Sequence, residues 1–311
     1  MRVLVTGASG WIGSGLVPEL IAAGHEVVGL ARSDDAATAV AALGAEVCRG
    51  SLDDLDRLRD AAKSADGVVH LAFRHDLIYT GDMVTAAVAD RHAIEMLGEA
   101  LAGSDRPLVI ASGVFGLAPG GVATEADATE ADEHLYAAAG PGAGRLANAH
   151  YTTALAARGV RSSVVRLPPT CHGQGDNGFM ARIVDIARQR GVSAYVGDGS
   201  ARWPATHRLD AAHAFRLALE KAPAGSTWHA VAEQGVRVRE FAEVIGRRLG
   251  VPVVSVSPGD AGEHFGFLGL LLQVDSQASS ARTRKELGWQ PTHPALLEDL
   301  EHDDYYSRPL P

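Results

Sequence analysis

The glycines of TGASGWIG, residues 6–13, have the spacing of a loop that binds a pyrophosphate. Gly7, Gly10 and Gly13 follow directly on the apolar run RVLVTG (2–7) and open a helical segment. Lacking a Cβ, they allow a tight strand-to-helix turn and a close approach of phosphate to the backbone. The free N–H groups and positive dipole end of the following helix attract the anion. The context predicts dinucleotide binding, with contacts from Gly7, Ser9, Gly10, Trp11, Ile12 and Gly13.

The end of the second strand, GLARSDD (29–35), bears on which dinucleotide is bound. An NAD site usually has an acidic residue there for the ribose 2′-hydroxyl, whereas an NADP site needs space and positive charge. Ala31 is small, Arg32 carries a planar guanidinium suited to phosphate, and Ser33 adds a hydroxyl. The negative charges of Asp34 and Asp35 would repel a 2′-phosphate. The alternative is therefore that Arg32 is an ordinary surface cation with no part in cofactor binding. We favour NADP(H), with NAD(H) as the alternative.

The elements that position this loop alternate between buried strands and helices. This order predicts an α/β fold, a Rossmann-type doubly wound parallel sheet with right-handed crossovers. Strands are expected at 2–7, 25–32, 45–50, 66–73, 106–113, 161–168 and 226–233. Helices are expected at 12–23, 35–43, 52–64, 83–102, 144–158, 179–191, 210–221 and 238–250.

Two units are expected along the chain. Residues 1–168 form the dinucleotide-binding unit, and 205–233 return to it. The smaller substrate-binding region consists of 169–204 and 234–311. From Asp299 onward, the acidic and then aromatic tail is expected to be solvated.

Composition excludes several classes of function. The 311 residues carry a net charge of −10, which argues against a nucleic-acid surface. No signal peptide precedes the first strand, and no apolar run is long enough to span a membrane. The two cysteines, Cys48 and Cys171, lie far apart, as in a reduced cytoplasmic protein. The 13 histidines form no metal-binding motif, so no metal site is expected.

Seven segments in order, beginning with TGASGWIG, resemble the short-chain dehydrogenase/reductase superfamily, in its extended, NAD-dependent epimerase/dehydratase-like branch. The others are GSLDDLDRL (50–58), VVHLAF (68–73), VIASGVFG (109–116), VVRLPPTCHG (164–173), WPATHRLDAAHAFRLALEK (203–221) and SSARTRKELGWQP (279–291). The resemblance implies a possible homodimer through 83–102 and 144–158. It also implies further cofactor contacts at Ser51, Leu52, Leu71, Ala72, Phe73, Ser112, Arg145, Pro168 and Thr170.

The chain departs from this family at the catalytic pair, so it resembles an atypical member that lacks the Tyr-x-x-x-Lys dyad. In the family, a Tyr phenol exchanges a proton with the substrate, and a Lys one helical turn later lowers the phenol pKa. Those positions fall on Gly140 and Gly144, or on Pro141 and Arg145 with a shift of one residue. Asp90 stands about where the family usually has Asn. Only Ser112 matches a family catalytic position.

Four side chains are candidates to replace the dyad. Arg145 can supply the charge and ribose contact of the lysine, or be an ordinary exposed Arg of its helix. Tyr136 precedes this helix and can reach the site from a loop. His75 and Tyr79 follow the fourth strand, at the sheet edge where ligands bind. We expect His75, Tyr79 and Trp203 to contact the substrate.

Three functions are compatible with these residues. The first is an NADP(H)-dependent reductase of a small organic carbonyl, imine or activated alkene, with a non-standard proton donor. The second is a non-catalytic NADP(H)-binding sensor or regulator, suggested by the missing dyad. The third, placed last, is a nucleotide-sugar epimerase or dehydratase.

Overall fold

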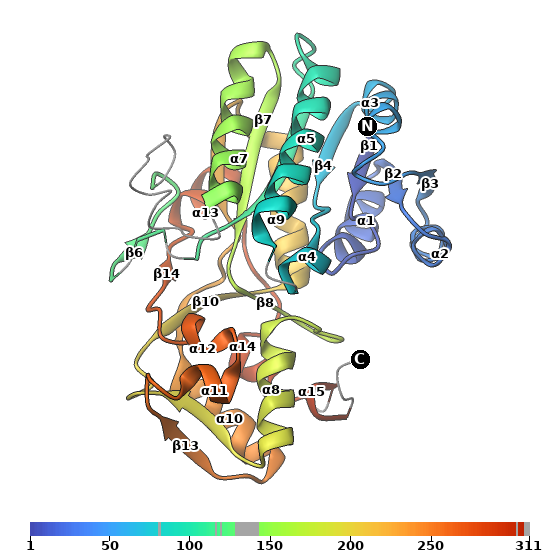
Figure 1. Cartoon of the computed structure of the whole chain (residues 1–311). Coiled ribbons are helices and arrows are strands. Elements are labelled where there is room, and N and C mark those ends of the chain that lie inside the picture. The colour runs from blue at the N-terminus through green and yellow to red at the C-terminus, as the bar shows by residue number, and fades with distance from the viewer. Residues whose placement is uncertain (80–81, 116, 119, 128–142, 303, 308–311) are drawn as a thin grey trace.

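Seven parallel strands form the central sheet of the computed structural model, within its described residues (1–311 without 80–81, 116, 119, 128–142, 303 and 308–311). Their order, β11-β7-β5-β4-β1-β2-β3, confirms the predicted doubly wound fold (Figure 1). Val3, Leu4 and Val5 of β1 are fully buried, because helices cover both faces of the sheet. The strands are β1 (Arg2–Thr6), β2 (Glu26–Ala31), β3 (Glu46–Arg49), β4 (Gly67–His70), β5 (Pro107–Gly113), β7 (Arg161–Leu167) and β11 (Ser226–His229).

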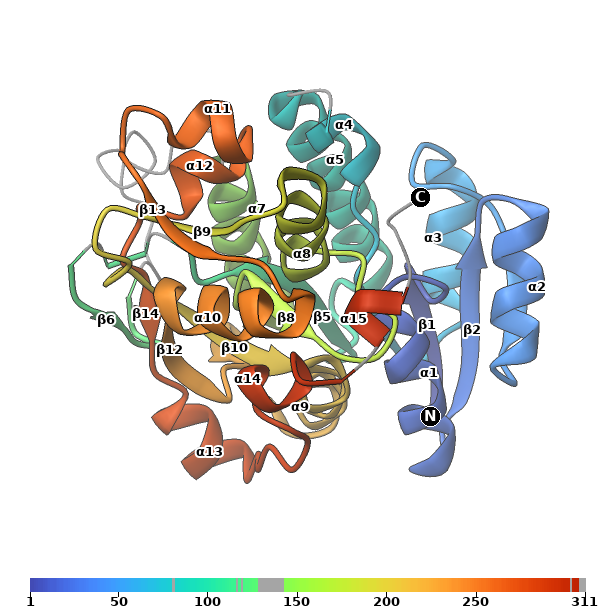
Figure 2. The same cartoon turned by 90° about the horizontal axis from the view of Figure 1, so that it is seen from below.

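A second group of elements lies below the sheet (Figures 1 and 2). Strands β8 (Thr170–His172), β10 (Arg202–His207) and β12 (Glu233–Arg237) form a small sheet, and β9 (Ser193–Val196) pairs with β13 (Val253–Val256). A separate apolar core around Trp203 and Phe241 holds these elements together. The helices here are α8 (Phe179–Arg190), α10 (Val238–Leu249), α11 (Ala261–Phe265), α12 (Leu268–Leu271), α14 (Leu296–Asp299) and α15 (Asp304–Ser307).

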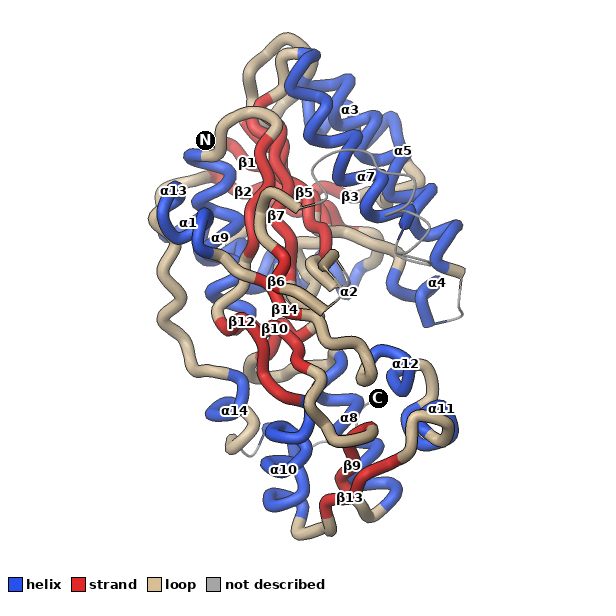
Figure 3. Tube along the Cα trace, turned by 90° about the vertical axis from the view of Figure 1, so that its left-hand side faces the viewer, coloured by secondary structure: helices blue, strands red, loops and turns tan. Residues whose placement is uncertain are grey.

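Helices cover the two faces of the central sheet in separate sets (Figure 3). On one face lie α3 (Leu55–Lys63), α5 (Met83–Leu101) and α7 (Ala143–Ala154), followed by the short helix η2 (Leu155–Arg158). On the other lie α1 (Gly13–Ala22), α9 (Arg208–Lys221) and α13 (Ala281–Leu287). Helix α2 (Asp34–Ala42) connects β2 to β3, α4 (His75–Tyr79) follows β4, and β6 (Val122–Ala123) pairs with β14 (Gln277–Ala278).

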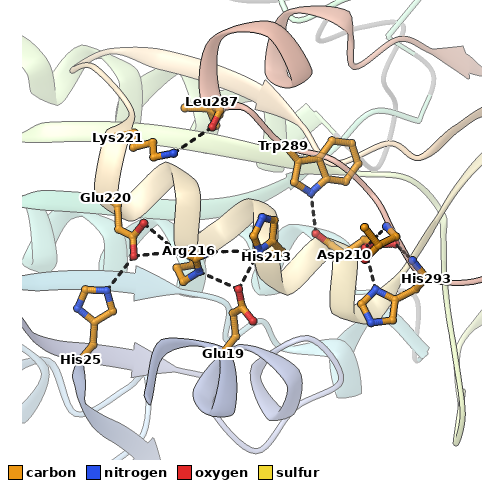
Figure 4. A network of polar contacts seen from close by, with 11 residues as sticks. Glu19, His25, Asp210, His213, Arg216, Glu220, Lys221, Leu287, Trp289 and His293 are labelled. Carbon is orange, nitrogen blue, oxygen red and sulfur yellow. Dashed lines mark hydrogen bonds and ion pairs between the residues drawn. The ribbon is translucent and has the colours of Figure 1, made fainter. Parts of the chain in front are cut away.

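Charged side chains fix α9 against its neighbours (Figure 4). Arg216 Nε donates to Glu19 of α1 at 2.7 Å, and the ring of His213 lies 2.8 Å from the same carboxylate. At the start of α9, Asp210 accepts from the backbone N–H groups of Thr292 and His293. Helix α9 therefore joins the glycine-loop helix to the C-terminal segment.

The structure corrects two sequence-based expectations. The segment after β4 includes a short helix, α4, where a loop was expected. The tail is not solvated from Asp299 onward, since Asp299, Leu300 and Tyr305 are all buried. The Tyr305 hydroxyl bonds to Asp176 and Asp299, and this contact ties the tail to the loop after β8.

Candidate functional site

The loop between β1 and α1 adopts its tight conformation only because its glycines lack a Cβ. Gly7 has φ +69°, and a Cβ there would lie 2.8 Å from the backbone nitrogen of Ala72. A Cβ on Gly13 would lie 2.1 Å from the carbonyl oxygen of Gly7, a distance that no side chain tolerates. Ser9 and Gly10, between them, are exposed. The loop thus has the tight, open backbone that a pyrophosphate requires.

Trp11 fastens this loop to the second group of elements. Its indole Nε1 donates to the carbonyl of Cys171 in β8 at 2.7 Å. The guanidinium of Arg208 lies 4.6 Å from the centre of the Trp11 ring and donates to Ser14 of α1 at 3.1 Å. Trp11 therefore positions the loop, and Ile12 packs against the adjoining core.

A second arginine, missed in the sequence, lies beside Arg32 and Ser33. The Arg49 guanidinium at the end of β3 pairs with Asp34 and donates to the carbonyl of Ser33 at 2.5 Å. Ser33 caps α2 by accepting from the N–H of Ala36, and Arg32 is exposed. The charge of Asp34, which would repel a 2′-phosphate, is thus paired with a cation. Because Arg49 comes from β3 and Asp34 from the start of α2, residue spacing in the sequence gave no signal of this ion pair.

The remaining expected cofactor contacts lie at or beyond the carboxyl ends of neighbouring strands, the usual ligand edge of such sheets. Ser112 is the penultimate residue of β5 and is 5% exposed. Thr170 begins β8, with a buried hydroxyl that bonds to no other described residue. The others follow β3 (Ser51, Leu52), β4 (Leu71, Ala72, Phe73) and β7 (Pro168).

Arg145 points from α7 toward this edge. Its Nη2 donates to the carbonyl of Ala111, the neighbour of Ser112, at 3.1 Å. Its guanidinium carbon lies 4.2 Å from the centre of the Phe73 ring, within cation–π range. Its Nε is buried, and no described residue accepts a hydrogen bond from it. Burial lowers the pKa of the guanidinium, against the charge of Asp90, so the site holds a partly unsatisfied cation.

Helices α5 and α7 pack closely at Gly144, one of the two positions expected for the family lysine. A Cβ on Gly144 would lie 2.5 Å from the Cβ of Ala87 in α5. A side chain at this position would therefore require the two helices to move apart. The other expected position is Arg145, whose guanidinium donates to Ala111 of β5.

The other candidate residues lie in different environments. The His75 ring lies 5.5 Å from the Phe73 ring, and its pKa is lowered by partial loss of water and by the charge of Arg145. Tyr79 ends α4, whereas Tyr136 lies outside the described residues. Trp203 is 0% exposed among Phe115, Phe179 and Phe241, so the expected substrate contact is corrected to a core position.

The fold and this edge together define a class of protein: a Rossmann-type protein with a dinucleotide-binding loop. The model of the NAD dependent epimerase/dehydratase family matches residues 3–231, and the chain belongs to this family. The suspected relationship to the extended short-chain dehydrogenases/reductases is thereby confirmed, and with it the assignment as an NAD(P)-binding enzyme.

Three known proteins illustrate the relationship. An uncharacterized protein of Schizosaccharomyces pombe is 46% identical over 307 residues, 98% of this chain and 100% of that one. A 4-hydroxy-2-methyl-3-oxo-4-farnesyl-3,4-dihydroquinoline-1-oxide ketoreductase of Stigmatella aurantiaca is 26% identical, over 81% of this chain and 74% of its own. The solved UDP-glucose 4-epimerase of Thermus thermophilus in complex with NAD has a TM-score of 0.73 at 20% identity, and 99% of each chain is covered.

None of the described helices is both long enough and apolar enough to cross a bilayer.

Proposed function

We propose that this protein is an NADP(H)-dependent reductase of a small organic carbonyl, imine or activated alkene. The observation that carries the proposal is the placement of the Arg145 guanidinium, which lies over the Phe73 ring and donates to the carbonyl of Ala111, the neighbour of Ser112. When bound, the reduced nicotinamide supplies the hydride, so the protein must mainly bind, orient and exclude water. The Stigmatella relative, a ketoreductase by name, supports this reaction type.

The chain's own residues have distinct parts in this proposal. The glycine loop binds the pyrophosphate, and Trp11 fastens that loop to β8. Arg145 supplies a positive charge at the edge where the cofactor binds. Ser112 orients the substrate oxygen, and the proton comes from Ser112 or from water. The basis for Ser112 is its place beside Ala111, whose carbonyl holds Arg145.

The preference for NADP(H) is part of the proposal and is supported by Arg32 and Arg49. Arg32 directly follows β2, two residues before α2 begins, and Arg49 is the last residue of β3. Because Arg49 pairs with Asp34, that carboxylate repels a 2′-phosphate less than its sequence position implies. Two guanidinium groups suit a phosphate dianion through charge-assisted hydrogen bonds.

Purified protein incubated with NADPH or NADH and a panel of aldehydes, ketones, enones and imines tests the proposal. The expected result is substrate-dependent NADPH oxidation that exceeds NADH oxidation. NADPH binding without oxidation across the panel would instead favour the sensor. Absence of any cofactor binding would overturn both.

A further inference from the structure

Four buried side chains form a continuous chain of hydrogen bonds from the end of β1 to α7. Thr6 Oγ1 lies 2.8 Å from His70 Nδ1, and His70 Nε2 lies 3.1 Å from Asp90 Oδ1. Asn148 Nδ2 donates to Asp90 Oδ2 at 2.7 Å. None of the four is more than 6% exposed. We refer to Thr6, His70, Asp90 and Asn148 as the buried polar chain.

Backbone groups add partners to the buried polar chain. The backbone N–H of Ala72 donates to Thr6 Oγ1 at 3.2 Å, and the same oxygen lies 2.8 Å from His70 Nδ1. The second ring nitrogen of His70, Nε2, faces the Asp90 carboxylate. Asn148 uses its second amide proton on the carbonyl of Ala87 at 2.9 Å. Both carboxylate oxygens of Asp90 therefore have a partner within the buried polar chain.

A cation outside the buried polar chain also acts on the carboxylate of Asp90. Arg145 supplies it from α7, one helical turn before Asn148. Although burial acts to raise it, the pKa of Asp90 is lowered by the hydrogen bond to His70 and by the charge of Arg145. A buried charge is costly unless it is compensated, and each of these two charges compensates the other.

We propose that Asp90 is a positioning residue for cofactor binding, which holds Arg145 by its charge and the glycine loop through His70 and Thr6. This inference rests on the proposed NADP(H)-dependent function. The buried polar chain joins three segments that meet at the cofactor edge: the start of the glycine loop, the exit of β4 at Ala72, and α7. Asp90 touches none of the reacting groups, so its effect is transmitted through Arg145 and Thr6.

The variant Asp90→Asn removes the charge at nearly constant volume and leaves one oxygen to accept from His70. Fluorescence titration is expected to show a Kd for NADPH about tenfold higher, as for the weakening of one charge-assisted contact. The double variant Asp90→Asn/Asn148→Asp restores a carboxylate inside the buried polar chain. It is expected to recover the NADPH affinity to within about threefold of wild type.

Asp82→Asn is the matched control, because Asp82 caps the same helix from an exposed position and asparagine preserves the cap. It is expected to bind NADPH like the wild type. The Tm of each protein without cofactor shows whether a variant is folded, so misfolding is separated from lost affinity. Recovery of NADPH affinity in the double variant is the result that a purely structural role of Asp90 would not give. Unchanged NADPH affinity in Asp90→Asn, or no recovery in a folded double variant, would overturn this inference alone. A wild-type chain that binds no NADPH would overturn the proposed function as well.

Discussion

The guanidinium carbon of Arg145 lies 4.2 Å from the centre of the Phe73 ring, so a cation from α7 covers the segment that leaves β4. Phe73 belongs to the expected cofactor contacts, and Arg145 is one of the two positions expected for the family lysine. The other is Gly144, where α7 and α5 touch and a Cβ would lie 2.5 Å from the Cβ of Ala87. The proposed function assigns to Arg145 the positive charge of the missing lysine.

Replacing Arg145 with methionine tests this relationship. Arg145→Met retains much of the side-chain length but removes the charge and the hydrogen bond to Ala111. We expect the Kd for NADPH to rise about 10- to 100-fold, as for the loss of a hydrogen bond from a charged group. Arg145→Lys should recover part of the affinity. Arg91→Met is the matched control, since Arg91 also lies over an aromatic ring, that of Tyr151, but on α5. An equal loss in both methionine variants would refute the assignment.

The substitution Gly13→Ala should weaken cofactor binding. The new Cβ would collide with the carbonyl of Gly7, and the loop must move to relieve the contact. We expect NADPH affinity to fall at least about tenfold, with a lower Tm, because overpacking costs about 1–3 kcal/mol. Gly262→Ala serves as the control, since a Cβ there meets nothing within 4 Å. Normal NADPH binding by Gly13→Ala would show that the pyrophosphate binds elsewhere.

Cofactor preference should depend on Arg49 as well as Arg32. Arg49→Met and Arg32→Met are each expected to raise the Kd for NADPH about tenfold through loss of a charged hydrogen bond. Binding of NADH should change little, since it has no 2′-phosphate. Isothermal titration with both cofactors measures the ratio, and Arg282→Met, in the Glu286 pair of α13, is the control. A parallel loss of NADH and NADPH affinity would argue for a structural role.

The stability of the fold should fall in acid partly because of His207. Burial and the neighbouring rings of His172 and His293 lower the pKa of His207 to about 4. The unfolded chain has an ordinary histidine pKa of about 6.5, so it binds the proton more readily than the folded protein. Stability from this group is therefore fully present above about pH 6.5 and is lost as the pH falls toward about 4.

His207→Asn removes this titration and retains an acceptor for the N–H of Leu209 at the start of α9. The slope of Tm against pH between about 6.5 and 4 should become shallower than in the wild type. Asp176, whose pKa burial raises to about 6, acts in the opposite direction but is present in both proteins. His92→Asn, an exposed substitution, should leave the slope unchanged. An unaltered slope in His207→Asn would contradict the account.

The fold was predictable because its signals are local. The predicted strand at 25–32 became β2 at Glu26–Ala31, and the predicted helix at 238–250 became α10 at Val238–Leu249. The glycine loop was predictable for the same reason.

The details of the site were less predictable because they depend on contacts between distant segments. The pairing of Arg49 with Asp34 joins the end of β3 to the start of α2, and the close contact at Gly144 involves Ala87 of another helix. Trp203 was expected at the substrate because of its type, but three aromatic neighbours bury it. The C-terminal tail was expected in solvent from its charge, yet the Tyr305 hydroxyl bonds to the carboxylates of Asp176 and Asp299.

The most direct test of the central claim is hydride transfer itself. Wild-type protein and Arg145→Met are incubated with NADPH deuterated at nicotinamide C4 and with the carbonyl, imine and enone panel, and the products are examined by mass spectrometry. The account predicts a product that is one deuterium heavier with the wild type, and a much lower yield with Arg145→Met. NADPH binding by the wild type without deuterium in any product of the panel would contradict it.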